Sequence, residues 1–319
     1  MGECEIPKKR GQMRFSPCMG VSDGKKDGKR GQRMILTYLG TAASEGWPAF
    51  FCRCPICKEA QKRGGKDFRN RSCAIVDDDL LIDMSPDIYA ARKQLDIDLT
   101  RVKSVLFTHS HKDHFNPELL RWYAPNFAKE NDRTPLKLYG SEGAKAVFDK
   151  LNDIWKSHYS DGWFSFTALE EFKRTQIDEK TFVTMYPAIH SIDDARVYLI
   201  ERDGKKLFYM HDSCMLEESV LKALEGENID AFSIDATRGI VKTPELVNSH
   251  HMGFDAVLKM RRIFIDRNIG RENSIYVANH ICIHSCTDEN GKMYFHEDME
   301  KLLQGTGVRV SYDGMAVEI

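Results

Sequence analysis

The chain has 319 residues and a formal net charge of −2, with 42% hydrophobic and 29% charged residues. These values are ordinary for a globular protein and exclude a bulk positive field that would favour nucleic acid or a membrane surface. Because no apolar stretch approaches about 18 residues, no transmembrane helix is expected. Residues 1–18 also lack the apolar run of a secretory signal.

Residues 1–33 differ in composition from the rest of the chain. They contain nine Lys and Arg residues against four Asp and Glu residues, and they show almost no apolar periodicity. Such a segment buries too little apolar surface to fold by itself. We predict a basic, flexible N-terminal tail over 1–33, with an arm for RNA or a partner as the alternative. One folded domain is predicted over 34–319.

The folded domain is predicted to begin with an apolar strand over 34–40, and a cluster of cysteines follows it. Cys52, Cys54 and Cys57 lie within six residues, in a chain whose nine cysteines are an odd number. The short cluster favours metal ligation in a reduced cytoplasm over a disulfide framework. Zinc is the expected metal, and a structural zinc site needs a fourth ligand. Three free buried cysteines are the alternative.

Apolar runs and turn signals predict the remaining elements in chain order. Strands over 73–76 and 80–83 are joined by three aspartates, and a helix over 88–95 follows the start signal Ser85-Pro86-Asp87. Further strands are expected over 102–107, 136–139, 182–186, 197–201, 207–210, 231–234, 274–278 and 308–311, and further helices over 117–123, 141–154, 216–224, 253–267 and 297–303. This order predicts an α+β fold, an αββα sandwich in which two mixed β-sheets are flanked by helices.

The segment over 155–180 carries several aromatic residues among polar ones. We interpret it either as a flap over a pocket or as an edge hairpin. Its four basic residues stand against five acidic ones, whereas a nuclease for long RNA would be expected to carry a basic arm that grips the substrate. The segment therefore weighs against long nucleic acid as a partner.

The run Thr108-His109-Ser110-His111-Lys112-Asp113-His114 carries the most chemical information in the chain. Three imidazoles and a carboxylate occupy six positions, directly after the apolar residues 105–107. That much polarity at the end of a buried strand is costly to desolvate unless a metal compensates it. The run predicts a two-metal hydrolytic centre, in which one ion activates water and both polarise the substrate. A solvated loop rich in histidine is the alternative.

A two-metal centre needs more ligands than one loop supplies. Three further residues of metal-binding type follow predicted strands, where a rigid backbone can fix them: His190, Asp212 and His280. Asp83 also ends a strand, and we expect it to orient the loop over 109–114 by hydrogen bonding. We therefore expect these strand ends to converge on that loop.

In their order along the chain, these residues resemble the five signature elements of the metallo-β-lactamase superfamily, over residues 34–319. The resemblance implies two metal ions, one bound by His109, His111 and His190, and the other by Asp113, His114 and His280. It further implies that Asp212 bridges the two ions and that a hydroxide between them is the nucleophile. It makes Asp113 both a ligand and a catalytic residue. Zinc, manganese and iron all suit such ligands.

The cysteine cluster resembles one branch of this superfamily, which contains the phosphonate-pathway phosphodiesterase that opens a cyclic phosphate on ribose. The branch implies a histidine shortly after the His280 position as the fourth zinc ligand, which points to His284. The spacing here is one residue longer than expected, so Cys282 and then Cys286 are alternatives. The pyrroloquinoline-quinone biosynthesis protein B family shares the cysteine loop and a sequence like 85–88, and is a competing resemblance.

Residues 251–258, HMGFDAVL, resemble the part of the phosphodiesterase branch that carries its candidate general acid. That acid would be His251, which would protonate the leaving alkoxide. Its neighbour His250 is an alternative, as is a purely structural role for His251. We expect His211 to lie in the core or to support a ligand. We expect His158 and His296 at the surface.

Taken together, the residues and the resemblance favour a binuclear metal-dependent hydrolase, a phosphodiesterase for small cyclic or linear phosphodiesters of the ribose or nucleotide type. The expected cofactors are two divalent ions, zinc or manganese, at the active site and one structural zinc. The expected partner is a small-molecule substrate rather than a membrane, and a homodimer is left open. The alternatives are a nuclease, lactonase or thioesterase on the same metals, or an oxidoreductase of quinone-cofactor biosynthesis.

Overall fold

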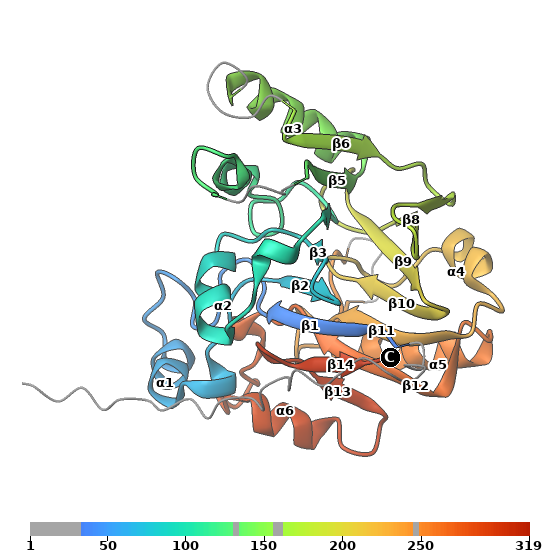
Figure 1. The fold of residues 1–319 in the computed structure, drawn as a ribbon. Coiled ribbons are helices and arrows are strands. Elements are labelled where there is room, and N and C mark those ends of the chain that lie inside the picture. The colour runs from blue at the N-terminus through green and yellow to red at the C-terminus, as the bar shows by residue number, and fades with distance from the viewer. Residues whose placement is uncertain (1–32, 130–133, 156–161, 245–248) are drawn as a thin grey trace, which may run out of the picture. The chain divides into compact units, whose positions relative to one another are not determined.

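A computed structural model describes residues 33–129, 134–155, 162–244 and 249–319 of the chain (Figure 1). The predicted tail over 1–33 lies outside these residues except for Arg33. Within the described ranges the strands form two seven-stranded mixed sheets, which confirms the predicted αββα sandwich. None of the helices in these ranges is long and apolar enough to span a membrane.

The first sheet has the strand order β14-β1-β2-β3-β4-β5-β6. Its strands are β1 (Ile35–Gly40), β2 (Cys73–Val76), β3 (Leu80–Ile82), β4 (Ser104–Leu106), β5 (Leu136–Gly140), β6 (Phe164–Ala168) and β14 (Ala316–Glu318). The pairings from β14 to β3 are antiparallel, and those from β3 to β6 are parallel. The carboxyl ends of β3 and β4 therefore meet at one edge.

The second sheet repeats this plan with the order β13-β12-β11-β10-β9-β8-β7. Its strands are β7 (Arg174–Gln176), β8 (Thr181–Pro187), β9 (Arg196–Arg202), β10 (Lys205–Met210), β11 (Ile229–Asp235), β12 (Gly270–Asn279) and β13 (Val308–Val310). The pairings from β7 to β10 are antiparallel and those from β10 to β13 are parallel. Because of this pattern, β8, β10, β11 and β12 all end at the same edge.

Helices cover the outer face of each sheet, and apolar side chains fill three layers. The α-helices are α1 (Pro55–Arg63), α2 (Ile88–Leu95), α3 (Glu142–Trp155), α4 (Glu218–Leu224), α5 (Phe254–Asp266) and α6 (His296–Leu302), and the 3-10 helices are η1 (Gly65–Asp67), η2 (Leu99–Arg101), η3 (Pro117–Tyr123) and η4 (Ile283–Ser285). Along β10, Leu207 and Tyr209 pack between the sheets, whereas Phe208 and Met210 pack toward the helices outside. This alternation is the two-residue period of a strand with both faces covered.

Polar contacts between the sheets fix their relative position. The Tyr198 hydroxyl donates to the carbonyl oxygen of Phe107 at 2.6 Å, just before the run over 108–114. At the opposite edge the buried guanidinium of Arg202 lies 2.6 Å from Asp79 and 3.2 Å from Asp77. Both ends of the sandwich are therefore held together, and the ligand-bearing edge rests on a rigid frame.

The structure decides between the two predictions for 155–180 and corrects the predicted elements in three other places. The described part of 155–180 supplies an edge strand to each sheet, since β6 pairs with β5 and β7 with β8. Because β7 and β8 are antiparallel and are joined by the short turn over 177–180, the described residues form the edge hairpin rather than a flap. The sequence reading also missed α1, which begins at Pro55 inside the cysteine cluster, and the short strand β14. The predicted helix over 117–123 is a 3-10 helix.

Candidate metal centre

The loop after β4 carries four of the expected ligands, and its own hydrogen bonds give it its shape. The amide of His114 donates to the carbonyl oxygen of His111 at 3.1 Å, and that of Phe115 donates to the same oxygen at 2.7 Å. This turn reverses the chain after His111. The side chains of His109 and His111 therefore lie on one side of the loop, and Asp113 and His114 belong to a second group.

Asp83 orients this loop, as the sequence predicts. Its buried carboxylate accepts hydrogen bonds from the amide and the hydroxyl of Thr108, at 2.8 and 3.0 Å. It also lies 2.7 Å from Nδ1 of His114. A proton held on Nδ1 leaves Nε2 of His114 as an electron-pair donor toward the second group. Burial lowers the pKa of His114, but the carboxylates of Asp83, Asp113 and Asp212 raise it well above the usual value.

The first group consists of His109, His111 and His190, whose ring nitrogens lie within 4.8 Å of one another. His190 follows β8, and its Nε2 lies 3.1 Å from Nδ1 of His111. Burial lowers the pKa of His109 well below its usual value and that of His190 to about 4. The three side chains are therefore grouped around one point, and at His109 and His190 burial favours the neutral imidazole that binds metal.

The second group consists of Asp113, His114, Asp212 and His280. The Nε2 atoms of His114 and His280 lie 3.1 Å apart, and Oδ2 of Asp212 lies 2.7 Å from the first and 3.4 Å from the second. The same Oδ2 lies 3.4 Å from Nε2 of His109 in the first group. Asp212 thus touches both groups, which is the position that the resemblance implies for a bridging ligand.

Three strand-end residues of this centre adopt a left-handed backbone conformation. The φ angles are 62° at Asp83, 47° at Asp212 and 61° at His280. Such angles are uncommon for residues other than glycine, and they persist where the surrounding structure enforces them. The backbone therefore turns sharply as it leaves β3, β10 and β12, and this turn places each side chain at the shared edge of the sheets.

The chemistry of the donors fits two divalent ions. Within the described residues, Nε2 of His109 is buried and has no hydrogen-bond partner. The Nε2 atoms of His114 and His280 lie 3.1 Å apart with no donor group between them. The carboxylate of Asp83 holds the other nitrogen of the His114 ring. Histidine nitrogens and carboxylate oxygens at this spacing are the ligands that zinc and related metals prefer. The residues present therefore suit the expected metals.

His251 lies beside both groups. Its Nδ1 is 3.3 Å from Oδ2 of Asp235 and 3.4 Å from Oδ1 of Asp212, and its ring centroid is 5.0 Å from that of His190. Burial lowers the pKa of His251, but the charges of Asp235, Asp212 and Asp113 raise it to about 9. His250 is exposed, and its ring centroid lies 6.1 Å from that of His190. Of the two candidates, His251 has the closer contacts with the centre.

Asp235 is a site residue that the sequence reading missed. It ends β11, is fully buried, and accepts hydrogen bonds from the amides of Asp212, Thr237 and Met252 at 3.0 to 3.1 Å. The Thr237 hydroxyl, which donates to it at 2.9 Å, lies 2.8 Å from Nδ1 of His280. The signal was present, since Asp235 follows an apolar strand just as Asp83 does. The predicted strand stopped one residue short of it.

Two other histidines lie away from the metal ligands' nitrogens. His211 is buried, with Nε2 2.7 Å from the Ser233 hydroxyl and Nδ1 3.2 Å from that of Ser72, as expected for a core residue. The surface prediction for His296 is wrong. This residue is buried, and its Nδ1 lies 3.2 Å from the guanidinium of Arg69. His158 lies outside the described residues.

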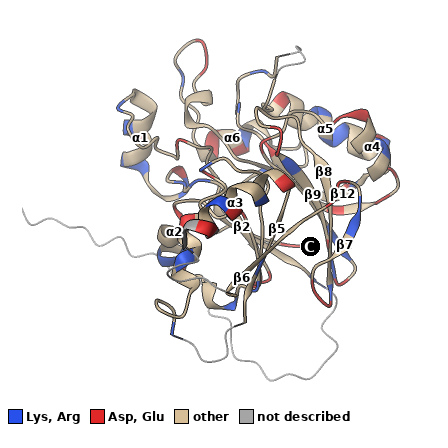
Figure 2. Ribbon diagram, turned by 90° about the horizontal axis from the view of Figure 1, so that it is seen from above, with Lys and Arg blue, Asp and Glu red and all other residues tan. Residues whose placement is uncertain are grey.

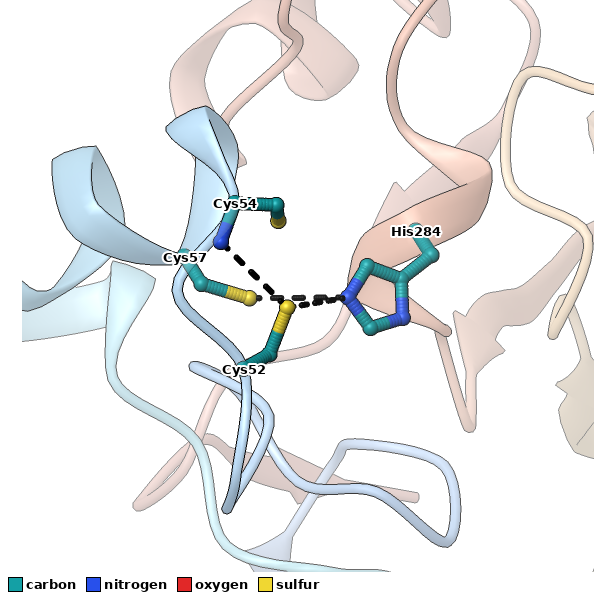
Figure 3. A group of neighbouring side chains, drawn as sticks. All are labelled: Cys52, Cys54, Cys57 and His284. Carbon is teal, nitrogen blue, oxygen red and sulfur yellow. Dashed lines mark hydrogen bonds between the residues drawn. The ribbon is translucent and has the colours of Figure 1, made fainter.

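The cysteine cluster forms a separate third group, shown in Figure 3, and His284 completes it. Nε2 of His284 lies 3.4 Å from Sγ of Cys52 and 3.6 Å from Sγ of Cys57. The amide of Cys54 donates to Sγ of Cys52 at 3.4 Å. Burial raises the pKa of Cys57 to about 12, whereas the amide and thiol of Cys54 lower that of Cys52 to about 6. Three thiols and one imidazole are the donor set of a closed zinc site.

The alternative fourth ligands do not join this group. Cys282 lies instead with Glu45 and the far side of His284, where Nδ1 is 3.8 Å from the Glu45 carboxylate. Cys286 is fully buried, with its sulfur against the carbonyl oxygen of Cys282 and the sulfur of Met299. The structure therefore favours His284 over both cysteines.

Comparisons with known proteins agree with this arrangement. A family model described as a beta-lactamase superfamily domain matches residues 79–264, whereas no curated protein matches the chain. A new diphosphatase of the PhnP family superposes with a TM-score of 0.66 at 19% identity, covering 90% of this chain and 98% of that one.

Two other solved structures share the same architecture. Zinc-bound PqqB from Methylobacterium extorquens gives a TM-score of 0.64 at 19% identity and covers 89% of this chain and 100% of its own. The short form of human tRNase Z gives 0.60 at 16% identity and covers 89% and 98%. At these identities the likeness establishes the fold and leaves the reaction to be argued from the site.

Proposed function

The chain belongs to the metallo-β-lactamase superfamily, and we propose that it is a binuclear metal-dependent hydrolase acting on small phosphodiesters. The observation that carries the proposal is the position of Asp212, whose carboxylate touches both ligand groups and lies beside His251. When bound, two divalent ions supply a water of lowered pKa and screen the charge of an anionic substrate. This chemistry suits hydrolysis of a phosphate ester.

The residues of the chain have distinct tasks in this proposal. His109, His111 and His190 present ring nitrogens to one ion, and Asp113, His114 and His280 present ligands to the other. Asp83 keeps the proton of His114 on Nδ1, so that Nε2 stays available. Asp235 acts in the same way on the other side of the centre, where it fixes Thr237 against Nδ1 of His280.

His251 is placed to complete the reaction by protonating the leaving oxygen. Nδ1 faces Asp235 and Asp212, so the opposite nitrogen, Nε2, is the one available to a substrate. A phosphodiester needs such a donor because an alkoxide is a poor leaving group without a proton. His250 is exposed and has no contact of this kind with Asp235 or Asp212 among the described residues.

The surface supports a small substrate rather than a long nucleic acid. The described part of 155–180 is rich in acidic residues, and two of its basic residues are paired with carboxylates, Lys173 with Glu170 in the same segment and Arg174 with Glu201 on β9. Figure 2 shows basic and acidic residues mixed along α4 and α5. Two of the similar structures, a diphosphatase and a tRNase, are named for reactions at phosphorus, which supports a phosphate ester over a lactone.

The test is hydrolysis of a panel of cyclic and linear phosphodiesters by manganese- or zinc-loaded protein. We expect turnover of cyclic ribose phosphates or a simple aryl diester. We expect a loss on the order of 10²–10⁴-fold in His251→Ala, which is the usual contribution of a general acid, and little change in the neighbouring control His250→Ala. The loss should shrink for an aryl diester with a good leaving group, because such a group needs less protonation.

An opposite result would move the assignment. If no diester turns over while both ions are shown to be bound, the phosphodiesterase proposal fails, and lactones and thioesters become the next substrates to test. If none of these is hydrolysed either, an oxidoreductase role like that considered for the quinone-cofactor family is the remaining reading. Equal losses in His250→Ala and His251→Ala would contradict the role given to His251.

A further inference from the structure

A cavity of about 940 Å³ opens on the outer side of the first sheet, between α2 and η3. Its walls are mainly apolar and include Leu81, Met84, Ile88, Leu119, Leu120 and Trp122. Several of these residues belong to the layer that packs the sheet against its helices. The volume is in the range of small-molecule sites, roughly 300–1,000 Å³. None of the metal-ligand side chains lines this cavity.

Large apolar side chains gather at the mouth of this cavity. Tyr89 is 65% exposed, Trp122 is 55% exposed and Phe127 is 41% exposed. The Trp122 and Phe127 rings pack edge to face, with centroids 4.7 Å apart. A group of exposed aromatic residues around an apolar pocket is unusual on a soluble domain and marks a binding surface. The mouth is therefore shaped to cover an apolar ligand.

The charge at the cavity identifies the polar end of the ligand. Of the described residues that line it, Arg92 alone is charged, and no carboxylate is among them. Asp98 lies outside the lining, and its pKa is lowered first by hydrogen bonds from the hydroxyl and amide of Thr100, at 2.6 and 3.0 Å, and only then by the charges of Arg101 and Arg92. The guanidinium at the mouth therefore complements an anion.

We propose that this cavity binds one soluble amphiphile, a molecule with an apolar chain and a single anionic head group. The apolar body lies against Leu119, Leu120 and Met84, and the head pairs with Arg92 at the mouth. This site is separate from the metal centre and independent of the reaction proposed there. It makes the outer layer of the first sheet a ligand-binding region in its own right.

Met84 connects the cavity to the metal-binding loop. Its amide donates to the carbonyl oxygen of His114 at 2.7 Å, and its own carbonyl oxygen accepts from the amide of Asn116 at 3.1 Å. It also directly follows Asp83, which holds Nδ1 of His114. A ligand packed on the Met84 side chain therefore stabilises the backbone that carries His114. The two hydrogen bonds of Met84 couple occupancy of the cavity to the metal-binding loop.

The test is calorimetric titration of the full chain with dodecanoate below its micellar concentration, and with dodecanol as the uncharged control. We expect one dodecanoate per chain and a raised melting temperature. Arg92→Gln should weaken dodecanoate about fivefold, as for an exposed ion pair, and leave dodecanol unchanged. Arg262→Gln, the same substitution at an exposed arginine outside the lining, should leave both unchanged.

Two variants test the apolar walls. Leu119→Trp fills the cavity and should abolish binding of both ligands. Trp122→Ala changes an exposed side chain, so it keeps the fold, and it should weaken both ligands about tenfold. In the wild type, dodecanoate should slow hydrogen exchange at the amides of Met84 and Asn116.

Several outcomes would overturn the proposal. These are no binding of either ligand, equal binding in Arg92→Gln and wild type, and unchanged affinity in Trp122→Ala. Binding only to anionic vesicles, with none to the monomer, would assign the surface to a membrane lipid instead. Binding with no change in exchange at Met84 would overturn the connection to the metal-binding loop.

Discussion

The metal centre and the cysteine cluster are built in opposite ways. The first gathers ligands from the ends of strands in both sheets, and His109, His114, Asp212 and His280 are at most 3% exposed. The second lies at the start of α1, takes three ligands from six consecutive residues, and includes the exposed His284 on η4. A rigid frame preorganises the first, whereas in the second a bound metal would hold two distant segments together. Loss of metal should therefore affect reactivity at the first and stability at the second.

The largest effect should follow from removing Asp212, which is shared by both ligand groups, or His111, a ligand of the first group. Asp212→Ala or His111→Ala should reduce hydrolysis to background and lower the metal content of the centre, because the ions lose a ligand. The measurement is activity together with bound metal per chain. Asp266→Ala, an exposed carboxylate paired with Arg262, is the matched control and should retain both. Full activity in Asp212→Ala would contradict the assignment of the centre.

A smaller effect is expected when the frame is changed and the ligands are kept. In Asp83→Asn the hydrogen bonds to Thr108 can persist in part, but the charge that holds the proton on Nδ1 of His114 is lost. Such supporting residues usually change activity or metal affinity by about 10–100-fold. Competition with a chelator measures the affinity. A loss as large as that of Asp212→Ala would mean that Asp83 is itself a ligand, and no loss would mean that the strand ends alone position His114.

The contrast also explains what the sequence could predict. Four of the ligands lie close together in the sequence: His109, His111, Asp113 and His114. The strands before the other three, His190, Asp212 and His280, are visible as apolar runs. The site could therefore be assembled by placing the strand ends at one edge. Asp235 directly follows the predicted strand over 231–234 but was not singled out, because its role depends on tertiary hydrogen bonds from the amides of Asp212 and Met252. Boundaries are set by tertiary pairing, here by β12 against β11, which local pattern does not contain.

Loops without such a pattern were harder to predict. The segment over 162–180 joins the two sheets, and its course depends on which edge strands are free, β5 in one sheet and β8 in the other. His296 looked like a surface residue because it stands among charged neighbours, yet the buried guanidinium of Arg69, which also donates to the carbonyl oxygen of Ser311 at 3.0 Å, lies against it. Contacts over more than 200 residues of chain leave no local signature.

The cysteine cluster should show the opposite balance of effects. Cys54→Ser should lower the melting temperature by roughly 5 °C, because a closed zinc site contributes folding free energy, while the activity of the folded fraction changes little. Differential scanning calorimetry and zinc content measure this. Cys214→Ser, a partly buried cysteine outside the cluster, is the control. An unchanged melting temperature would count against a structural zinc.

The same measurement sharpens the choice of fourth ligand. His284→Ala should lose the zinc to the same extent as Cys54→Ser. Cys282→Ala should keep it, because the Cys282 side chain faces Glu45 rather than the three thiols. If Cys282→Ala loses the zinc and His284→Ala keeps it, Cys282 is the ligand. The geometry around His284 would then change when zinc binds.

The smallest effect concerns the buried contact between Arg69 and His296. Like the cysteine cluster with His284, this contact holds the cysteine-bearing loop in place. Burial and then the charges of Arg69 and Lys66 lower the pKa of His296 to about 3. Below pH 6.5 this histidine is protonated in the unfolded chain, whereas in the folded chain it stays neutral down to about pH 3. The free energy of unfolding therefore falls as the pH decreases from 6.5 to 3. The free energy of unfolding, measured with denaturant at several pH values, should therefore depend more steeply on pH in wild type than in His296→Gln. Wild type should lose about 1 kcal/mol more of this free energy between pH 6.5 and 5. If the free energies of unfolding of the two proteins change with pH in the same way, His296 is in contact with water. The cysteine cluster would then be the main contact that holds this loop.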